Sequence, residues 1–128
     1  MNVMLELKTV GIAFQAGRFP EALDKISTLW EKIPNPKTEI ANSYLVIEYG
    51  VAISLKAGDL KTAEKWAALA TSFTAKRQDL GEVEFLVGKV AFERGAIEEA
   101  KRNFLIAHAK SDGRIFEGVD RKYIGVIL

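Results

Sequence analysis

A six-residue pattern that occurs three times constrains the fold of this chain more than any other feature. It reads "GRFPEA" at residues 17–22, "GDLKTA" at 58–63 and "GAIEEA" at 95–100, at intervals of 41 and 37 residues. Each copy has a glycine, an apolar residue two places on and an alanine five places on. Self-similarity of this kind indicates an internal structural repeat.

The segments on either side of each copy are predicted to be helical, because their apolar residues recur at three-to-four residue spacing. No segment keeps the strict alternation typical of a strand. We expect helices over about 4–14, 20–33, 38–56, 60–73, 79–94 and 97–110. Asp59 is the expected N-cap of the fourth helix.

The repeated pattern has a steric interpretation. Its glycine favours the left-handed conformation that ends a helix. Its apolar residue is expected to plug the turn onto the core, and its alanine lets two helices approach closely. In the three copies these residues are Gly17, Phe19 and Ala22; Gly58, Leu60 and Ala63; and Gly95, Ile97 and Ala100. The chain is therefore expected to contain three helix pairs.

These residues resemble tetratricopeptide repeats, which place a glycine in the first helix and alanines on the second. The third copy matches best, with Val87, Gly88, Gly95, Ile97, Ala100, Phe104 and Ala107. The second departs at Val51 and the first at Val10 and Leu29. The resemblance implies an all-α protein, a right-handed stack of three antiparallel helix pairs (a TPR-like α-solenoid) over 1–110. The pairs would span about 1–36, 37–76 and 77–110, with longer connections near 34–43 and 72–82.

The tail, residues 111–128, does not continue the repeat. One interpretation is a C-terminal cap, in which apolar residues cover the end of the array: Ile115, Phe116, Tyr123, Ile124 and Ile127. The tail also resembles the ending of small bacterial helical-repeat proteins, several of which look like immunity proteins encoded beside contact-delivered toxins. The residues that carry this resemblance are Gly113, Arg114, Phe116, Asp120, Lys122 and Tyr123. A cap and a binding role are compatible.

Composition excludes several classes of function. Lysine and arginine total 18 against 17 acidic residues, so no electrostatic case exists for nucleic acid or an anionic membrane. There is no cysteine, and the N-terminal segment lacks the order of a signal peptide. The longest apolar stretch, 44–55, contains Glu48 and is too short to cross a bilayer. We expect a cytoplasmic protein, a monomer or a homodimer that associates through Val3, Met4 and Leu5.

Catalytic and cofactor sites are not expected. His108 is the only histidine, and a lone helical histidine is more often structural or solvated than a metal ligand. Glu98 and Glu99 fall in the first turn of a predicted helix, where acids complement the helix dipole. No glycine-rich phosphate loop or nucleophile motif is present. We therefore expect no enzyme activity, no metal and no cofactor.

Binding of another protein remains as the expected function, and the resemblance to tetratricopeptide repeats implies which residues would form the binding surface. First helices line the concave surface of such a stack. Transfer of its groove positions gives Phe14, Gln15, Glu48, Lys56, Glu82, Phe85, Lys89, Phe92 and Glu93. Phe85 and Phe92 either form an exposed aromatic patch around Lys89 or belong to the core. In the tail, the candidates are Arg114, Phe116, Lys122 and Tyr123.

The preferred hypothesis is a protein–protein interaction module without catalysis, and specifically a bacterial immunity protein that binds and neutralises a toxin domain encoded upstream. The alternative is a TPR adaptor or secretion chaperone that holds a partner peptide in its concave groove.

Overall fold

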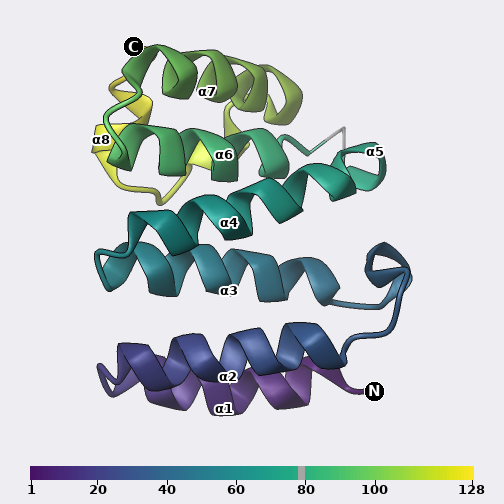
Figure 1. Ribbon diagram of the computed structural model, residues 1–128. Helices are drawn as coiled ribbons and strands as arrows, with labels where there is room; N and C mark the ends of the chain where they lie inside the picture. The colour runs from purple at the N-terminus through teal and green to yellow at the C-terminus, as the bar shows by residue number, and fades with distance from the viewer. Residues whose placement is uncertain (78–79) are drawn as a thin grey trace. The chain divides into compact units, whose positions relative to one another are not determined.

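Residues 1–77 and 80–128 are described in a computed structural model, and these residues form helices and turns without a strand (Figure 1). The α-helices are α1 (Val3–Gln15), α2 (Phe19–Lys32), α3 (Ser43–Lys56), α4 (Leu60–Ala70), α5 (Thr74–Arg77), α6 (Glu82–Glu93), α7 (Ile97–Ser111) and α8 (Arg121–Ile124). Short 3-10 helices are η1 (Lys37–Glu39), η2 (Thr71–Phe73) and η3 (Arg114–Phe116). The all-helical class expected from the sequence is confirmed for this part of the chain.

The three copies of the repeated pattern form the same turn. Gly17, Gly58 and Gly95 have φ of +76°, +76° and +88°, in the left-handed region. The amide of each following residue donates 2.9 Å to the carbonyl of the residue five places before it, which closes the preceding helix. The alanines Ala22, Ala63 and Ala100 are fully buried. The predicted left-handed conformation of the glycines is thus confirmed, and the alanines lie in the core.

The apolar residue two places after each turn glycine differs in burial among the three copies. Phe19 and Leu60 are half-buried, and the Phe19 ring lies 5.9 Å from that of Phe14. Ile97 is 46% exposed, so the expectation that it plugs onto the core is wrong for the third copy.

A glycine–aromatic contact recurs in two helix pairs. Gly88 of α6 faces the ring of Phe104 on α7, and Gly50 of α3 faces the indole of Trp66 on α4. In both cases a Cβ would overlap the ring. The second copy therefore has its first-helix glycine at position 50, one residue before the expected position at Val51.

Two predicted helix starts differ from the structure. The helix expected from Thr38 begins at Ser43, because Asn42 adopts a φ of 65° and η1 occupies Lys37–Glu39. Lys37 explains part of this local order, since its Nζ donates to the carbonyls of Trp30 and Ile33 at the end of α2. The helix expected from Asp79 begins at Glu82, after Gly81 with φ of +75°, and Asp79 itself lies outside the described residues.

The fourth helix begins where the sequence predicted but ends earlier. Asp59 Oδ1 accepts the amide hydrogen of Thr62 at 3.1 Å, and Oδ2 accepts its hydroxyl at 2.7 Å. These hydrogen bonds hold the pKa of Asp59 below its usual value. The expected N-cap is confirmed. At the other end α4 stops at Ala70, and Phe73 lies in η2.

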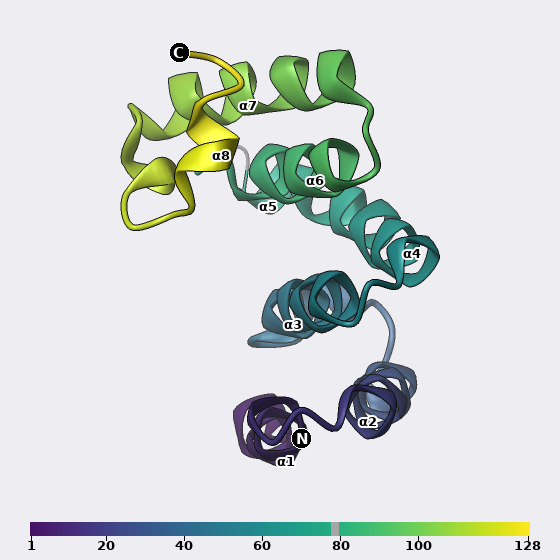
Figure 2. The same ribbon diagram turned by 90° about the vertical axis from the view of Figure 1, so that its left-hand side faces the viewer.

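The chain divides into two compact units, residues 1–66 and 67–128, with the division inside α4. In the first unit α2 packs against both α1 and α3. In the second unit α6 packs against α7, and the tail joins their core (Figure 2). Among the described residues, no helix combines the length and the apolar run that a bilayer crossing requires.

Candidate interaction surface

The tail is hydrogen-bonded to the C-terminal end of α6. Tyr123 donates its hydroxyl hydrogen to Oε1 of Glu93 at 2.9 Å, across 30 residues of sequence. Lys122 Nζ lies 2.7 Å from the same oxygen. Asp120 begins α8 as its N-cap, since Oδ1 accepts the amide hydrogen of Lys122 at 3.0 Å. Residues predicted from two separate stretches therefore meet at one place: Glu93 of α6 with Lys122 and Tyr123 of the tail.

Aromatic rings from α6, α7 and the tail form the core beneath these polar contacts. Phe85 is 8% exposed, and its ring centroid lies 5.0 Å from that of Phe116 and 5.7 Å from that of Phe104. Tyr123 stacks edge-on at 6.3 Å from Phe85. Of the two alternatives for Phe85, the structure shows the core residue. Phe116 and Tyr123 are buried as well, so these three rings offer little surface to a partner.

Phe92 differs from Phe85 because it lies at the edge of this core. It is half-buried, and its ring meets that of Tyr123 edge-on at 5.4 Å. Lys122 Nζ stands 5.9 Å from the centroid of Phe92 and 5.1 Å from that of Tyr123. On α6, Lys89 Nζ lies 4.8 Å from the centroid of Phe85. Cations thus cover the rims of the aromatic core, at distances where they interact with the rings.

The contacts of Glu93 also raise the pKa values of two tail residues, Lys122 and Tyr123. Its hydrogen bond raises the pKa of Lys122. Burial raises the pKa of Tyr123, and the adjacent Glu93 carboxylate raises it further. Lys122 is therefore a cation and Tyr123 a neutral hydrogen-bond donor at neutral pH.

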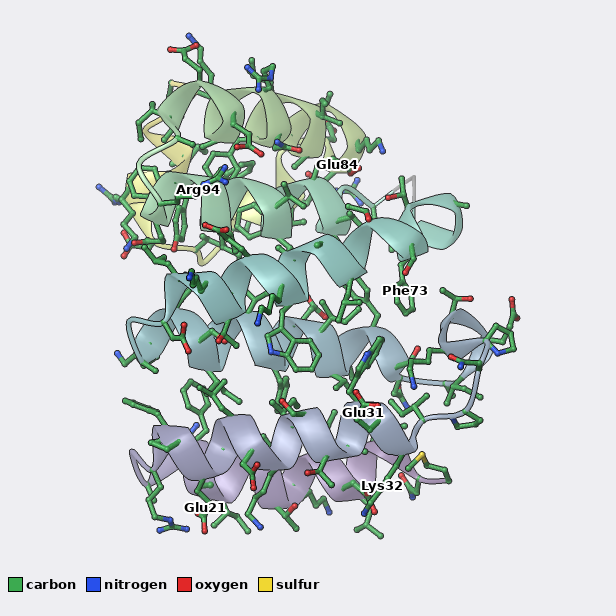
Figure 3. All side chains as sticks on the ribbon, viewed as in Figure 1. Glu21, Glu31, Lys32, Phe73, Glu84 and Arg94 are labelled. Carbon is green, nitrogen blue, oxygen red and sulfur yellow. The ribbon has the colours of Figure 1, made fainter. Side chains whose placement is uncertain are left out.

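Glu82 and Arg114, at the other end of α6, line one cavity. The cavity is open, about 380 Å³, and its walls are Leu80, Glu82, Lys110, Ser111, Asp112, Arg114 and Ile115. Lys110 Nζ forms an ion pair with Glu84 at 3.1 Å. A ligand in this cavity would have to break that pair to bind Lys110. Arg114 is exposed, and its side chain makes no hydrogen bond or ion pair with the residues that the structure describes. Figure 3 labels Glu84, which lies in the first turn of α6, and Arg94, which is its C-cap.

The other predicted groove residues belong to the first unit. Phe14 is half-buried against Phe19, and Gln15 is the exposed last residue of α1. Glu48 is half-buried within α3, and Lys56 is the exposed last residue of that helix. For the homodimer prediction, Met4 and Leu5 are exposed whereas Val3 is buried, so Val3 is not available for association.

His108 and the adjacent glutamates Glu98 and Glu99 all lie on α7, in positions that helix structure and packing explain. His108 is half-buried, with its ring 5.9 Å from that of Phe116. Glu98 and Glu99 lie in the first turn of α7, and Glu99 is hydrogen-bonded to Arg94. Across the described part of the chain, no three histidine, aspartate or glutamate side chains gather as a metal ion would require.

Sequence reasoning did not predict the link between Glu93 and the tail. It named each partner, but helical periodicity relates residues within about two turns and carries no signal for a contact 30 residues apart. Comparison with known proteins adds no likeness: no protein-family model matches the chain, and no curated protein or solved structure matches it either.

Proposed function

We propose that this chain is a protein–protein interaction module without catalysis, built as a TPR-like solenoid of three antiparallel helix pairs. The repeated turn supports this arrangement, since all three copies share the left-handed glycine and the buried alanine. The glycine–aromatic contacts of Gly50 with Trp66 and Gly88 with Phe104 support a common pair geometry. Residues 111–128 act in this proposal as the cap of the last pair.

The specific function we propose is that of a bacterial immunity protein, acting in the cytoplasm, that binds and neutralises a toxin domain. The observation that carries the proposal is that the six residues of the tail motif fall into two groups. Packing and backbone geometry account for four of its residues: Gly113 with φ of +79°, the buried Phe116 and Tyr123, and the N-cap Asp120. They do not account for Arg114, which is an exposed cation, while Lys122 is exposed as well although it pairs with Glu93.

The exposed groups at the two ends of α6 suit a protein partner: Lys122 and the edge of Phe92 lie at its C-terminal end, and Arg114 lies at the other end. Arginine and aromatic side chains contribute most to binding in protein interfaces. The cations lie on a unit whose aromatic core fixes the tail, so the backbone that carries them loses little conformational entropy when a partner binds.

The proposal is tested by expressing the full chain with the product of the reading frame upstream of its gene. We expect a one-to-one complex in size-exclusion chromatography and rescue of growth from the toxicity of that product. Arg114→Glu and Lys122→Gln should each weaken binding at least about tenfold, which is about 1.4 kcal/mol. Calorimetry on the purified proteins measures the loss.

Lys25→Glu, at an exposed cation of α2 in the first unit, is the control and should leave affinity unchanged. A complex that is insensitive to Arg114 and Lys122 but lost in Lys56→Glu or Gln15→Ala would favour the alternative, an adaptor or secretion chaperone that holds a peptide in its groove. Absence of any complex, with no toxicity from the neighbouring product, would reject the immunity function.

A further inference from the structure

The outward side of α7 carries a second surface that packing does not explain. Phe104 and Ala107 of this helix are buried against α6 and the tail. On the opposite side Leu105 and Ile106 are 48% and 46% exposed. We define the outer face of α7 by its exposed residues Glu98, Lys101, Arg102, Leu105, Ile106 and Ala109.

The equivalent positions of the other copies show that the repeat does not need apolar residues here. In register with the turn glycines, Leu105 and Ile106 correspond to Ser27 and Thr28 on α2, both exposed. On α4 they correspond to Ala68 and Leu69. At these positions two large aliphatic side chains thus lie side by side in water on α7 but not on α2 or α4, and exposed apolar patches can mark binding surfaces.

The charges of the outer face restrict what can cover it. Lys101 and Arg102 are exposed, and neither side chain makes an ion pair or a hydrogen bond with the described residues. Each stands four residues before one of the aliphatic side chains, on the same side of the helix. A partner that covers Leu105 and Ile106 therefore brings its own groups close to two unpaired cations.

We propose that the outer face of α7 docks an acidic amphipathic helix of a partner protein. The apolar stripe of such a helix packs on Leu105 and Ile106, and its flanking carboxylates pair with Lys101 and Arg102. An anionic bilayer fits less well, since two cations beside Glu98 fall short of the four to eight that polybasic membrane segments use. This surface is separate from Arg114 and Lys122 and goes beyond the immunity function.

The probe is a synthetic, fluorescently labelled helical peptide with a leucine stripe flanked by glutamates. Its control has the same leucines flanked by lysines. With the full chain, we expect the acidic peptide to bind and the basic one to bind at least about tenfold more weakly, with the difference shrinking as salt screens the charges. Fluorescence anisotropy at low and high salt measures both affinities.

The variants separate the apolar and ionic contributions. Leu105→Ser with Ile106→Thr installs the residues of the first copy and should abolish binding, whereas Lys101→Glu with Arg102→Glu should reverse the preference between the peptides. The reciprocal Ser27→Leu with Thr28→Ile should gain no binding of the acidic peptide, because Asp24 stands where α7 has Arg102. Circular dichroism checks that each variant is folded.

Three results would overturn the proposal. Equal binding of both peptides would show an unspecific apolar contact. Binding only to phosphatidylserine vesicles would identify a membrane surface. A dimer that dissociates in Leu105→Ser with Ile106→Thr would show that a second copy of the chain covers this face.

Discussion

Three helical glycines differ in what a methyl group at their Cα would meet. On Gly50 it would overlap the Trp66 indole, on Gly88 it would lie 2.6 Å from Cδ1 of Phe104, and on Gly11 it would have no atom within 4 Å. Alanine favours a helix over glycine by about 1 kcal/mol, while overpacking costs about 1–3 kcal/mol. We expect Gly11→Ala to raise the free energy of unfolding by up to about 1 kcal/mol. Gly50→Ala and Gly88→Ala should lower it by about 1 kcal/mol.

Urea denaturation followed by circular dichroism at 222 nm measures the three variants against the parent. Because each exchanges the same two residues inside a helix, Gly11→Ala serves as the control for propensity. If all three shift the midpoint in the same direction, the glycine–aromatic contacts have no energetic role.

How far single residues were predictable depends on the range of their contacts. The turn glycines and Asp59 were predicted because their roles depend on backbone within a few residues. Gly50 was missed by one position, since the family pattern was aligned on the turn and not on the ring that the glycine accommodates. The burial of Phe85 could not be decided from its helix alone, because Phe116 of the tail covers it.

Among the elements, the tail depends most on a long-range contact, and its stability should respond to alkaline pH. Burial and Glu93 raise the pKa of Tyr123 in the folded chain. Its contribution to stability is therefore fully present below its unfolded pKa of about 10 and is lost as pH rises toward the folded pKa. The loss amounts to about 1.4 kcal/mol per pH unit. At pH 7, Tyr123→Phe should cost about 1 kcal/mol through the lost hydrogen bond.

Free energies of unfolding from urea titrations between pH 7 and 11 test this expectation. The parent should lose its advantage over Tyr123→Phe above pH 10, so the two profiles converge there. Tyr49→Phe, at an exposed tyrosine of α3, is the matched control. Parallel profiles for the parent and Tyr123→Phe would mean that the hydroxyl of Tyr123 keeps a normal pKa.

The boundaries of elements were less predictable than their existence. Apolar periodicity located α1, α2, α4, α6 and α7, whose stripes face a neighbouring helix. The start of α3 was placed five residues early, because no local pattern shows that Asn42 takes a left-handed conformation. The tail was expected as a cap from its apolar residues, and these residues pack on the core of α6 and α7. Its hydrogen bonds to Glu93 could be seen only in the folded chain.

At the scale of the whole molecule, the two compact units share one helix, since their division falls between Trp66 and Ala67 inside α4. Both tryptophans belong to the first unit, where their rings lie 5.9 Å apart. The tryptophan signal therefore reports on the first unit, and the aromatic core of α6, α7 and the tail belongs to the second. This separation of probe and core allows a test of whether the units unfold together.

We expect Phe104→Ala, which empties a fully buried site of the second unit, to destabilise the chain by about 3–5 kcal/mol. Because α4 forms continuous helix across the division, loss of the second unit should fray the segment that carries Trp66. Urea unfolding followed by tryptophan fluorescence should then shift to the same lower midpoint as circular dichroism. Ile26→Ala, in the first unit, is the positive control. A fluorescence midpoint unchanged in Phe104→Ala, beside a biphasic circular dichroism curve, would show that each unit unfolds independently and that the shared helix does not couple them.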